Sequence, residues 1–398
     1  MKKIHLTASA ILAMLHSFAQ SHSVDTGFTS RKLKIDEINL VSSYYHQEGN
    51  NSAVTGGIGS EKLTDLSNSI DIKLIRYDKK NRKQSYAIDL GIDHYTSASS
   101  DMIDLKANSS ASHADTRIYP SLTWSIENAK KGRTIAAGAS YSSEFDYHSY
   151  GGNVLFAQKT PDRMGEFTAK IQVYLDQVSL VKPIELREPA PNGRHQEDYP
   201  TTPRNTFVGS LSYSQIVNDR LQMMLLADVV QQQGYLGLPF HRVYFTDGSV
   251  HQEQLPDSRL KLPLGFRSSY FINDRFILRT YYRYYIDNWG IQANTIQLEV
   301  PVKLSPFVSI SPFYRYYQQT AAKYFAPYEV HQGGETYYTS NYDLSRFTSH
   351  FIGAGIHLAP ANGLFGIRGL NMLEIRYGHY VKSTNMNANI VSLNLKFK

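Results

Sequence analysis

The 398-residue sequence contains no cysteine, which excludes disulfide bonds and thiolate metal sites. After its first segment it has no apolar run of about 18 residues, which excludes a transmembrane helix from the rest of the chain. It also has no glycine-rich phosphate loop, no metal-spaced Cys/His cluster and no helical heptads. These absences leave no motif for nucleotide chemistry, and we expect no cofactor.

Charge is also limited. The net charge of +6 is modest for this length and is no evidence for a nucleic-acid partner. Hydrophobic residues make up 41% of the chain, yet the mean hydropathy is −0.38, so about half of each element must be polar. Tyrosine is abundant, with 29 residues, and its apolar ring and polar hydroxyl suit a membrane interface.

The first residues predict export. Lys2 and Lys3 precede an apolar segment over residues 6–15, and Ser17-Phe18-Ala19 places small residues three apart. This pattern indicates a secretory signal peptide cleaved after Ala19. We therefore divide the chain into a signal peptide at 1–19, a short N-terminal segment at 20–32 and a single domain at 33–398.

The last stretch shows how that domain is built. Val391, Leu393, Leu395 and Phe397 alternate with polar residues up to the final Lys398. Successive side chains of a strand point to opposite faces, so this segment is an amphipathic strand with no polar tail after it. The pattern is typical of a barrel whose last strand pairs with its first, and the alternative is the edge strand of a soluble sandwich.

The same period of two recurs along the chain and predicts an all-β fold. We count about sixteen strands (range 14–18) of about ten residues, the length that crosses a bilayer at a tilt. Connections alternate between short ones, near residues 80, 130, 163, 219, 274 and 305, and long ones, near residues 105, 190, 245 and 332. This alternation predicts a transmembrane antiparallel β-barrel with short periplasmic turns and long extracellular loops.

The barrel prediction assigns each face of the strands. Apolar faces must contact lipid, because an arginine facing lipid at mid-membrane costs about 2–4 kcal/mol. The charged residues on the opposite faces are therefore predicted to line the lumen: Asp89, Asp93, Lys261, Arg267, Arg279, Arg283, Glu299, Lys303, Arg315, Glu374 and Arg376.

A family resemblance agrees with this architecture. The hairpin end over residues 91–101, the segment Glu144-Phe145-Asp146-Tyr147-His148-Ser149 and the barrel-like C-terminus resemble the domain-of-unknown-function 3570 family of predicted Gram-negative outer-membrane β-barrel proteins. The resemblance covers nearly all of the chain after the signal peptide. It implies a barrel in the outer membrane, but it supplies no substrate and no catalytic residues.

Two hairpin ends carry candidate metal ligands. Clustered carboxylates on loops suit calcium, and histidine beside carboxylates suits a transition metal. The candidate residues are Asp93, Asp101, Glu144, Asp146 and His148. The alternative, which we favour, is a hydrogen-bonded network that closes the hairpins, because the spacing does not show that these ligands converge.

The lumenal cations suggest a function. Lys261, Arg267, Arg279, Arg283, Lys303 and Arg315 come from neighbouring strands and could form one basic surface that favours anions. Alternatively, acids neutralise them and the interior is filled. If the lumen is open, replacing Arg279 and Arg283 by Glu is expected to shift ion selectivity toward cations without loss of folding.

We therefore expect an outer-membrane barrel for porin-like passage or uptake of small polar solutes, anions among them. Its partners would be outer-membrane lipids and the barrel-assembly machinery. The alternative is a non-conducting surface or assembly barrel whose long loops bind a periplasmic or surface partner protein. A hydrolase is the minor reading: strand histidines and serines are present, but no nucleophile elbow is. We expect no enzyme.

Overall fold

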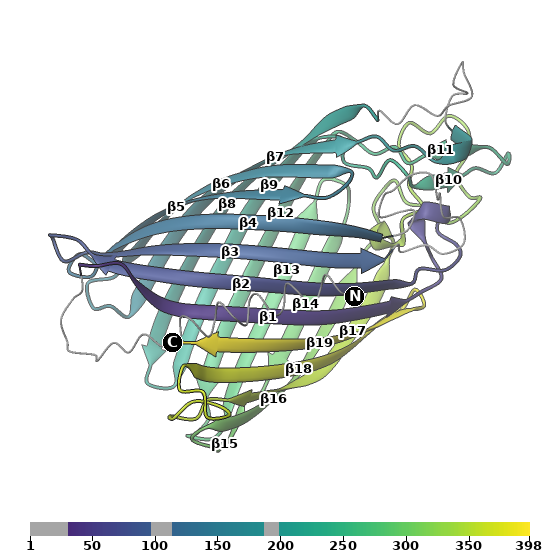
Figure 1. The fold of residues 1–398 in the computed structure, drawn as a ribbon. Coiled ribbons are helices and arrows are strands. Elements are labelled where there is room, and N and C mark those ends of the chain that lie inside the picture. Colours follow the sequence, from purple (N-terminus) through teal and green to yellow (C-terminus); the bar gives the residue numbers. More distant parts are fainter. Residues whose placement is uncertain (1–30, 97–113, 187–198) are drawn as a thin grey trace.

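The computed structural model describes residues 31–96, 114–186 and 199–398. One antiparallel sheet curves around the molecule and closes on itself (Figure 1). Within these ranges, no helix is long and apolar enough to span a bilayer.

Each strand of the barrel pairs with the next one along the chain, so the topology is up-and-down. β14 and β15 together make one interrupted strand, because both pair with β16 and are separated by Val300 and Pro301. Proline cannot donate to a ladder, which accounts for the break. The barrel therefore has sixteen strands, as the sequence predicted: β1 (Lys34–Glu48), β2 (Leu63–Tyr77), β3 (Lys83–Thr96), β4 (Ala114–Asn128), β5 (Arg133–Ser143), β6 (Tyr147–Lys159), β7 (Gly165–Ser179), β8 (Thr201–Asn218), β9 (Leu221–Gly234), β12 (Ser258–Phe271), β13 (Ile277–Asp287), β14 (Gln292–Glu299) with β15 (Val302–Ser305), β16 (Val308–Gln319), β17 (Phe347–Leu358), β18 (Leu370–Lys382) and β19 (Met386–Phe397).

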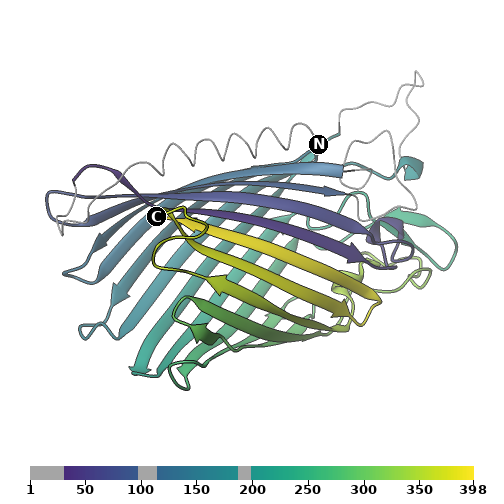
Figure 2. The same ribbon diagram turned by 60° about the horizontal axis from the view of Figure 1, so that its bottom comes forward.

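The last strand closes the barrel, which confirms the prediction made from its sequence. β19 pairs antiparallel with β1, with Phe397 opposite Ile38 and Leu395 opposite Leu40. Figure 2 shows these two strands side by side, in yellow and purple. Closure leaves no unpaired sheet edge, which is the condition for strands to lie in hydrocarbon.

The two ends of the barrel differ. At one end, here called the turn end, β1 begins, β19 ends and most connections are short. The opposite, loop end carries the long connections, including 49–62, 235–257 and 320–346. Three connections at the loop end are nevertheless short, at 144–146, 288–291 and 383–385, so the predicted alternation of short and long is incomplete.

The outer face of the barrel is apolar. Leu122, Ile171, Leu225, Leu264 and Ile352 point outward and are between 52% and 67% exposed. Exposed apolar patches of more than a few hundred Å² are rare on soluble monomers, whereas a membrane barrel requires them. The register places Asp71 opposite Asp89 on the inner face, between outward pairs such as Ile70 with Leu90.

Connections at the loop end pack together into a structure that we call the loop cap, made of the described residues of 49–62, 235–257 and 320–346. The short strands β10 (Arg242–Tyr244) and β11 (Val250–Gln252) pair within it (Figure 1). Val243, Phe245 and Tyr338 form its small apolar core. The buried Glu253 carboxylate accepts hydrogen bonds from the Leu238 N–H (2.8 Å) and from the Thr339 hydroxyl, which ties two long loops together.

Candidate functional site

Four cations on adjacent strands form what we call the basic wall of the lumen: Lys261 and Arg267 on β12, Arg283 on β13 and Arg315 on β16. Across the described residues, none of the four forms an ion pair with a carboxylate. Arg315 donates instead to the Gln297 amide oxygen (2.9 Å). Arg267 and Arg315 are exposed on the inner face, so their charge meets the lumen directly.

Aromatic rings hold these arginines extended. The Arg267 guanidinium lies 5.1 Å from the ring centroid of Tyr281, and that of Arg315 lies 5.5 Å from the ring of Phe351. A cation over an aromatic face is stabilised by about 0.5–1 kcal/mol at an exposed site, without loss of its charge. The rings therefore position the cations and leave their charge available to a solute.

A second group of lumenal charges is neutralised. Glu299 accepts from Arg279 (3.0 Å) and from Arg376 (3.1 Å), and Arg376 also donates to Glu374 (3.0 Å). The Glu299 side chain is 10% exposed, whereas that of Arg279 is 54% exposed. This network lies near the turn end and links β13, β14 and β18 across the inner face. It also means that Arg279 is paired with an acid, unlike the cations of the basic wall that it was predicted to act with.

Acids gather on the other side of the lumen. Asp93 accepts from the Ser67 hydroxyl (2.5 Å) and the Tyr119 hydroxyl (2.8 Å), and Asp89 accepts from Ser121 (2.6 Å). β3, which carries both carboxylates, is eight strands from β13 in either direction around the barrel. The acidic and basic surfaces therefore face each other across the lumen.

The predicted lumenal residues thus fall into three groups on the inner face. Lys261, Arg267, Arg283 and Arg315 form the basic wall, while Asp89 and Asp93 lie opposite. Arg279, Glu299, Glu374 and Arg376 make the neutralised network. Lys303 is apart from all of them, exposed on β15 at the turn end. Whether these residues border a conducting path remains a prediction.

Four of the five candidate metal ligands lie among the described residues. Asp93 is engaged in the bonds described above, Asp101 lies outside the described residues, and His148 faces Ser143 (3.0 Å) on the outer side of β6. Within 31–96, 114–186 and 199–398, no three His, Cys, Asp or Glu side chains are placed to hold a metal ion.

Glu144 and Asp146 belong instead to a hydrogen-bonded network at the hairpin end. Glu144 accepts from the Tyr95 hydroxyl, and Asp115 accepts from the Phe145 N–H (3.1 Å). Burial raises the pKa of Asp146 to about 6, and repulsion from Glu144 and Asp115 adds to the shift. These contacts are of the kind that the sequence analysis gave as the alternative to a metal site, a hydrogen-bonded network at the hairpin end.

Besides the contact of Ser143 with His148, the hydrolase reading finds a Ser–His contact at a loop tip. The Ser249 hydroxyl lies 3.0 Å from Nε2 of His251 and 2.6 Å from the Asp247 carboxylate. A catalytic triad needs the carboxylate to orient the histidine, but here it bonds to the serine. The strand histidines His350 and His379 bond to Tyr314 (2.7 Å) and Asn389 (2.9 Å). This geometry supports no catalytic role.

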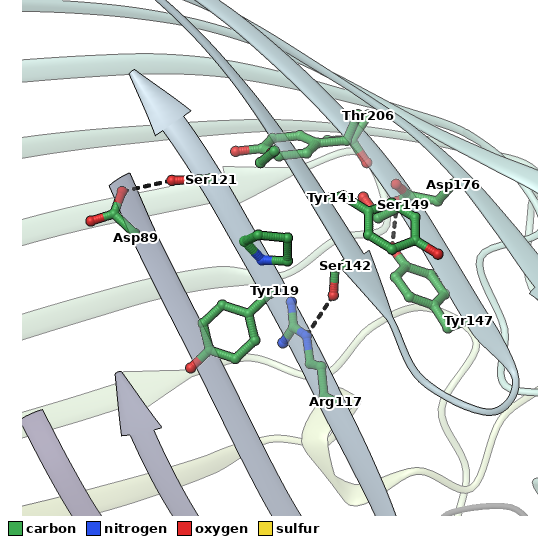
Figure 3. A pocket seen from close by; sticks show the side chains of 13 residues that line it. Asp89, Arg117, Tyr119, Ser121, Tyr141, Ser142, Tyr147, Ser149, Asp176 and Thr206 are labelled. Carbon is green, nitrogen blue, oxygen red and sulfur yellow. Dashed lines mark hydrogen bonds between the residues drawn. The ribbon is translucent and has the colours of Figure 1, made fainter. Parts of the chain in front are cut away.

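Two cavities open in the lumenal wall at the loop-end half of the barrel. The larger, pocket A, has a volume of 390 Å³ and lies against strands β3 to β8 (Figure 3). Arg117 donates to the Ser142 hydroxyl (2.8 Å) within it, and the Tyr147 hydroxyl donates to Asp176. The remaining lining includes Asp89, Tyr119, Ser121, Ser140, Ser149, Tyr174 and Thr206.

The smaller cavity, pocket B, has a volume of 270 Å³ and lies on the basic wall beside Arg259 and Arg283. Asp343 and Leu344 of the 320–346 loop form part of its lining, so this loop folds back against the barrel wall. We call residues 341–345 the inner segment. Asp343 pairs with Lys382 (2.7 Å), whose side chain is only 3% exposed, and Gln319 donates to the Ser345 carbonyl (2.6 Å).

Sequence reasoning missed both pockets and the inner segment. Arg117 and Asp176 carried no motif, because a pocket residue on a strand looks like any other inward polar residue. Tyr147 was named only as part of the family-like segment 144–149 and was given no role. One signal was available for pocket A: the inward positions of β5 and β6 hold a run of small residues.

Comparisons with known proteins identify a family. The family described as protein of unknown function (DUF3570) matches residues 94–365. No curated protein matches the sequence.

Solved structures that resemble the chain are outer-membrane barrels. The siderophore receptor PirA from Acinetobacter baumannii has 11% identity and a TM-score of 0.44, with 86% of this chain and 52% of that chain covered. A mutant of the ferric enterobactin receptor PfeA from Pseudomonas aeruginosa has 12% identity and a TM-score of 0.46, with 87% and 54% covered. OccK9 (OpdG) from Pseudomonas aeruginosa has 8% identity and a TM-score of 0.42, with 93% and 99% covered. The chain spans about half the length of the two receptors.

Proposed function

Because the chain belongs to the DUF3570 family of proteins of unknown function, we propose a function from its own barrel: porin-like passage of small polar solutes, with a preference for anions, across the outer membrane. The observation that carries this proposal is the basic wall, where four cations that pair with no carboxylate of the described residues line one side of the lumen. Basic rings and walls attract anions into a pore.

The width of the barrel supports an aqueous path. Barrels of 16–18 strands leave a water-filled channel unless something plugs them. The exposure of Arg267 and Arg315 on the inner face shows space in front of the wall. A charged side chain that points into an apolar or filled interior would need a partner, and these two arginines have no acidic one among the described residues.

The neutralised network and the inner segment limit the selectivity. Glu299 and Glu374 cancel part of the positive charge near the turn end, and the acids of β2 and β3 face the basic wall. We therefore propose a moderate anion preference and no strict exclusion of cations. The inner segment narrows the lumen at pocket B, beside Arg283.

In this proposal the turn end faces the periplasm and the loop cap faces outward, as in outer-membrane barrels generally. The protein is then expected to fractionate with outer membranes and to change its mobility on gels with heating. Recovery as a soluble periplasmic protein would exclude this location. The lipids of the outer membrane and the barrel-assembly machinery are the partners that this location requires.

The decisive experiment is conductance of the purified protein in planar bilayers. Steady open current, with a reversal potential that favours chloride in a potassium chloride gradient, supports the proposal. Swelling of proteoliposomes in isotonic small anions or sugars tests solute passage independently of the electrical measurement. A barrel that is folded by heat-modifiability but remains electrically silent and impermeable refutes it.

The loop cap favours a second candidate, a surface barrel that binds a partner protein. Loops without a role would not need the packed core of Val243, Phe245 and Tyr338 or the buried bond between Glu253 and Thr339. A rigid loop surface is typical of a recognition site. A silent barrel that co-purifies with one partner, and loses it when residues 235–257 are replaced by a short turn, would support this candidate.

A further inference from the structure

We infer that pocket A is a binding subsite for a neutral, polyhydroxylated solute of the saccharide class. This goes beyond anion passage, since the pocket lies on strands β3 to β8 and the basic wall lies on β12 to β16. Its volume of 390 Å³ falls within the range of about 300–1,000 Å³ that is typical of small-molecule sites, whereas the 270 Å³ of pocket B falls below it.

Small residues create the hollow. The inward positions of β5 and β6 near the loop end are glycine and serine, between the larger Tyr119 on β4 and Tyr174 on β7. A Cβ atom added to Gly151 would lie 2.2 Å from the Ser140 hydroxyl oxygen and 3.0 Å from the Tyr174 ring. The shape of the pocket therefore depends on glycine at this position.

Arg117 supplies hydrogen-bond donors to the pocket. Its Nε donates to Ser142, and its guanidinium lies 5.0 Å from the ring centroid of Tyr119. In the described part of the chain, no acceptor bonds to its two terminal nitrogens. Figure 3 shows the guanidinium among the lining side chains, where these nitrogens can donate to a ligand.

Asp176 supplies an acceptor that lacks a partner. The residue is 4% exposed, and its Oδ2 accepts from the Tyr147 hydroxyl. Its Oδ1 is buried with no hydrogen-bond partner among the described residues, a state that costs about 1–3 kcal/mol or more for a charged group. A ligand hydroxyl that donates to this oxygen would remove the cost.

The charges disfavour an anion, because the carboxylates of Asp89 and Asp176 outnumber the guanidinium of Arg117. Hydroxyl groups both donate and accept, so a polyol can bond to the carboxylates, to the guanidinium and to the serine hydroxyls at once. Tyrosine rings offer apolar faces for the C–H groups of a sugar. A saccharide therefore matches every group that lines pocket A.

The test compares three probes of one ring size on the purified, detergent-solubilised barrel: glucose, glucuronate and glucosamine, with maltose as a longer neutral probe. Saturation-transfer NMR reports binding, and titration gives the dissociation constant. We expect saturable binding of glucose and maltose, and binding of glucuronate that is at least about tenfold weaker, because the anion meets two carboxylates and one guanidinium. Glucosamine tests for a cation site: binding of it more than about tenfold tighter than that of glucose overturns the inference. Equal binding of all three monosaccharides overturns the inference.

Variants locate the site. Arg117→Met and Asp176→Asn each remove one set of hydrogen bonds to a charged group, worth about 1.5–3 kcal/mol, so maltose should bind at least about tenfold more weakly. Asp274→Asn and Arg275→Met are matched controls in the exposed turn between β12 and β13 and should bind like wild type. Heat-modifiability shows that each variant is folded.

The outcomes separate this inference from the proposed passage. Maltose binding that is absent in wild type, or unchanged in Arg117→Met and Asp176→Asn, overturns the subsite even if the barrel conducts. Saturable binding that both variants lose supports the subsite even if the barrel is silent. If the pocket variants fail to fold, the monosaccharide comparison on wild type still decides the question.

Discussion

Three of the four charges of the basic wall can be removed with the loss of one described hydrogen bond, from Arg315 to Gln297, and of three ring contacts. Replacement of Arg267, Arg283 and Arg315 by glutamine takes three positive charges from the lumen and breaks no ion pair. Arg279, which the sequence grouped with Arg283, is unsuitable, because it is bound to the nearly buried Glu299. The earlier expectation that folding would survive Arg279→Glu is weakened, since two carboxylates would then lie side by side.

The size of the effect follows from Coulomb's law. A unit charge about 8 Å from the path of an anion in water contributes about 0.5 kcal/mol. At 0.1 M salt the Debye length is about 10 Å, which reduces this value to about 0.2–0.3 kcal/mol. Three charges then give about 0.7 kcal/mol, or about a threefold change in the local anion concentration. The cation concentration changes by the same factor in the opposite direction, so the local anion-to-cation ratio changes about tenfold.

The assay is the reversal potential in a potassium chloride gradient across a planar bilayer. The triple variant should shift toward cations by about tenfold in permeability ratio, and the shift should nearly vanish at 1 M salt, where the Debye length is about 3 Å. The control is a second triple variant, in which glutamine replaces Lys79, Lys80 and Lys130. It removes the same charge from exposed turns at the turn end of the barrel. Conductance with an unchanged reversal potential in the triple variant would refute the role of the basic wall.

Three further predictions concern stability. Phe397→Ala should reduce the heat-modifiable fraction several-fold, because β19 closes the barrel on β1; normal assembly would show that closure tolerates the loss. Burial raises the pKa of Glu61 from its ordinary 4.5 to about 7, so the folded state keeps a proton that the unfolded state releases, and stability falls as pH rises between these values. In Glu61→Gln, the protection factors of residues 49–62, which correct exchange for its intrinsic pH dependence, should no longer differ between pH 5 and pH 8; a difference that persists assigns it to another group. Arg279→Ala should lower the urea stability by about 1 kcal/mol, since Glu299 keeps only Arg376, whereas Arg283→Ala should change it little.

Much of the barrel could be predicted from the sequence because its physics is local. Alternation of Tyr86, Ile88 and Leu90 with Ala87 and Asp89 assigns both faces of a strand without knowledge of its neighbours. Strand number and closure then follow from the requirement that no sheet edge meets lipid. The interruption between β14 and β15 is local too, since Pro301 lies in the middle of an alternating segment.

The candidate site could be predicted only in part, because it depends on the register between strands. Arg279, Glu299 and Arg376 come from three strands, and Arg279 is the direct cross-strand partner of Glu299. Arg376 reaches Glu299 across β16 and β17, which carry the small residues Ser311 and Gly355 in register with it. The alternation of polar and apolar residues predicts that these three side chains lie on the same face of the sheet. It does not predict that they touch one another. The loop cap could not be predicted, because its segments have no hydrophobic periodicity. Their conformation depends on individual hydrogen bonds, such as the one that Glu253 accepts from the Leu238 N–H.

We expect the pairing of β1 with β19 to be the slowest step in the folding of the barrel. Every other pair of strands in the barrel joins segments that follow one another in the chain, whereas Ile38 meets Phe397 from the opposite end of the domain. Contacts of such long sequence separation carry the largest loop-closure entropy and slow the folding of β proteins. Fifteen hairpin-type pairings can therefore form in local steps, and the final seam is the step with the highest contact order. Until it forms, β1 and β19 expose two free edges, and these edges are where a second chain could pair by mistake.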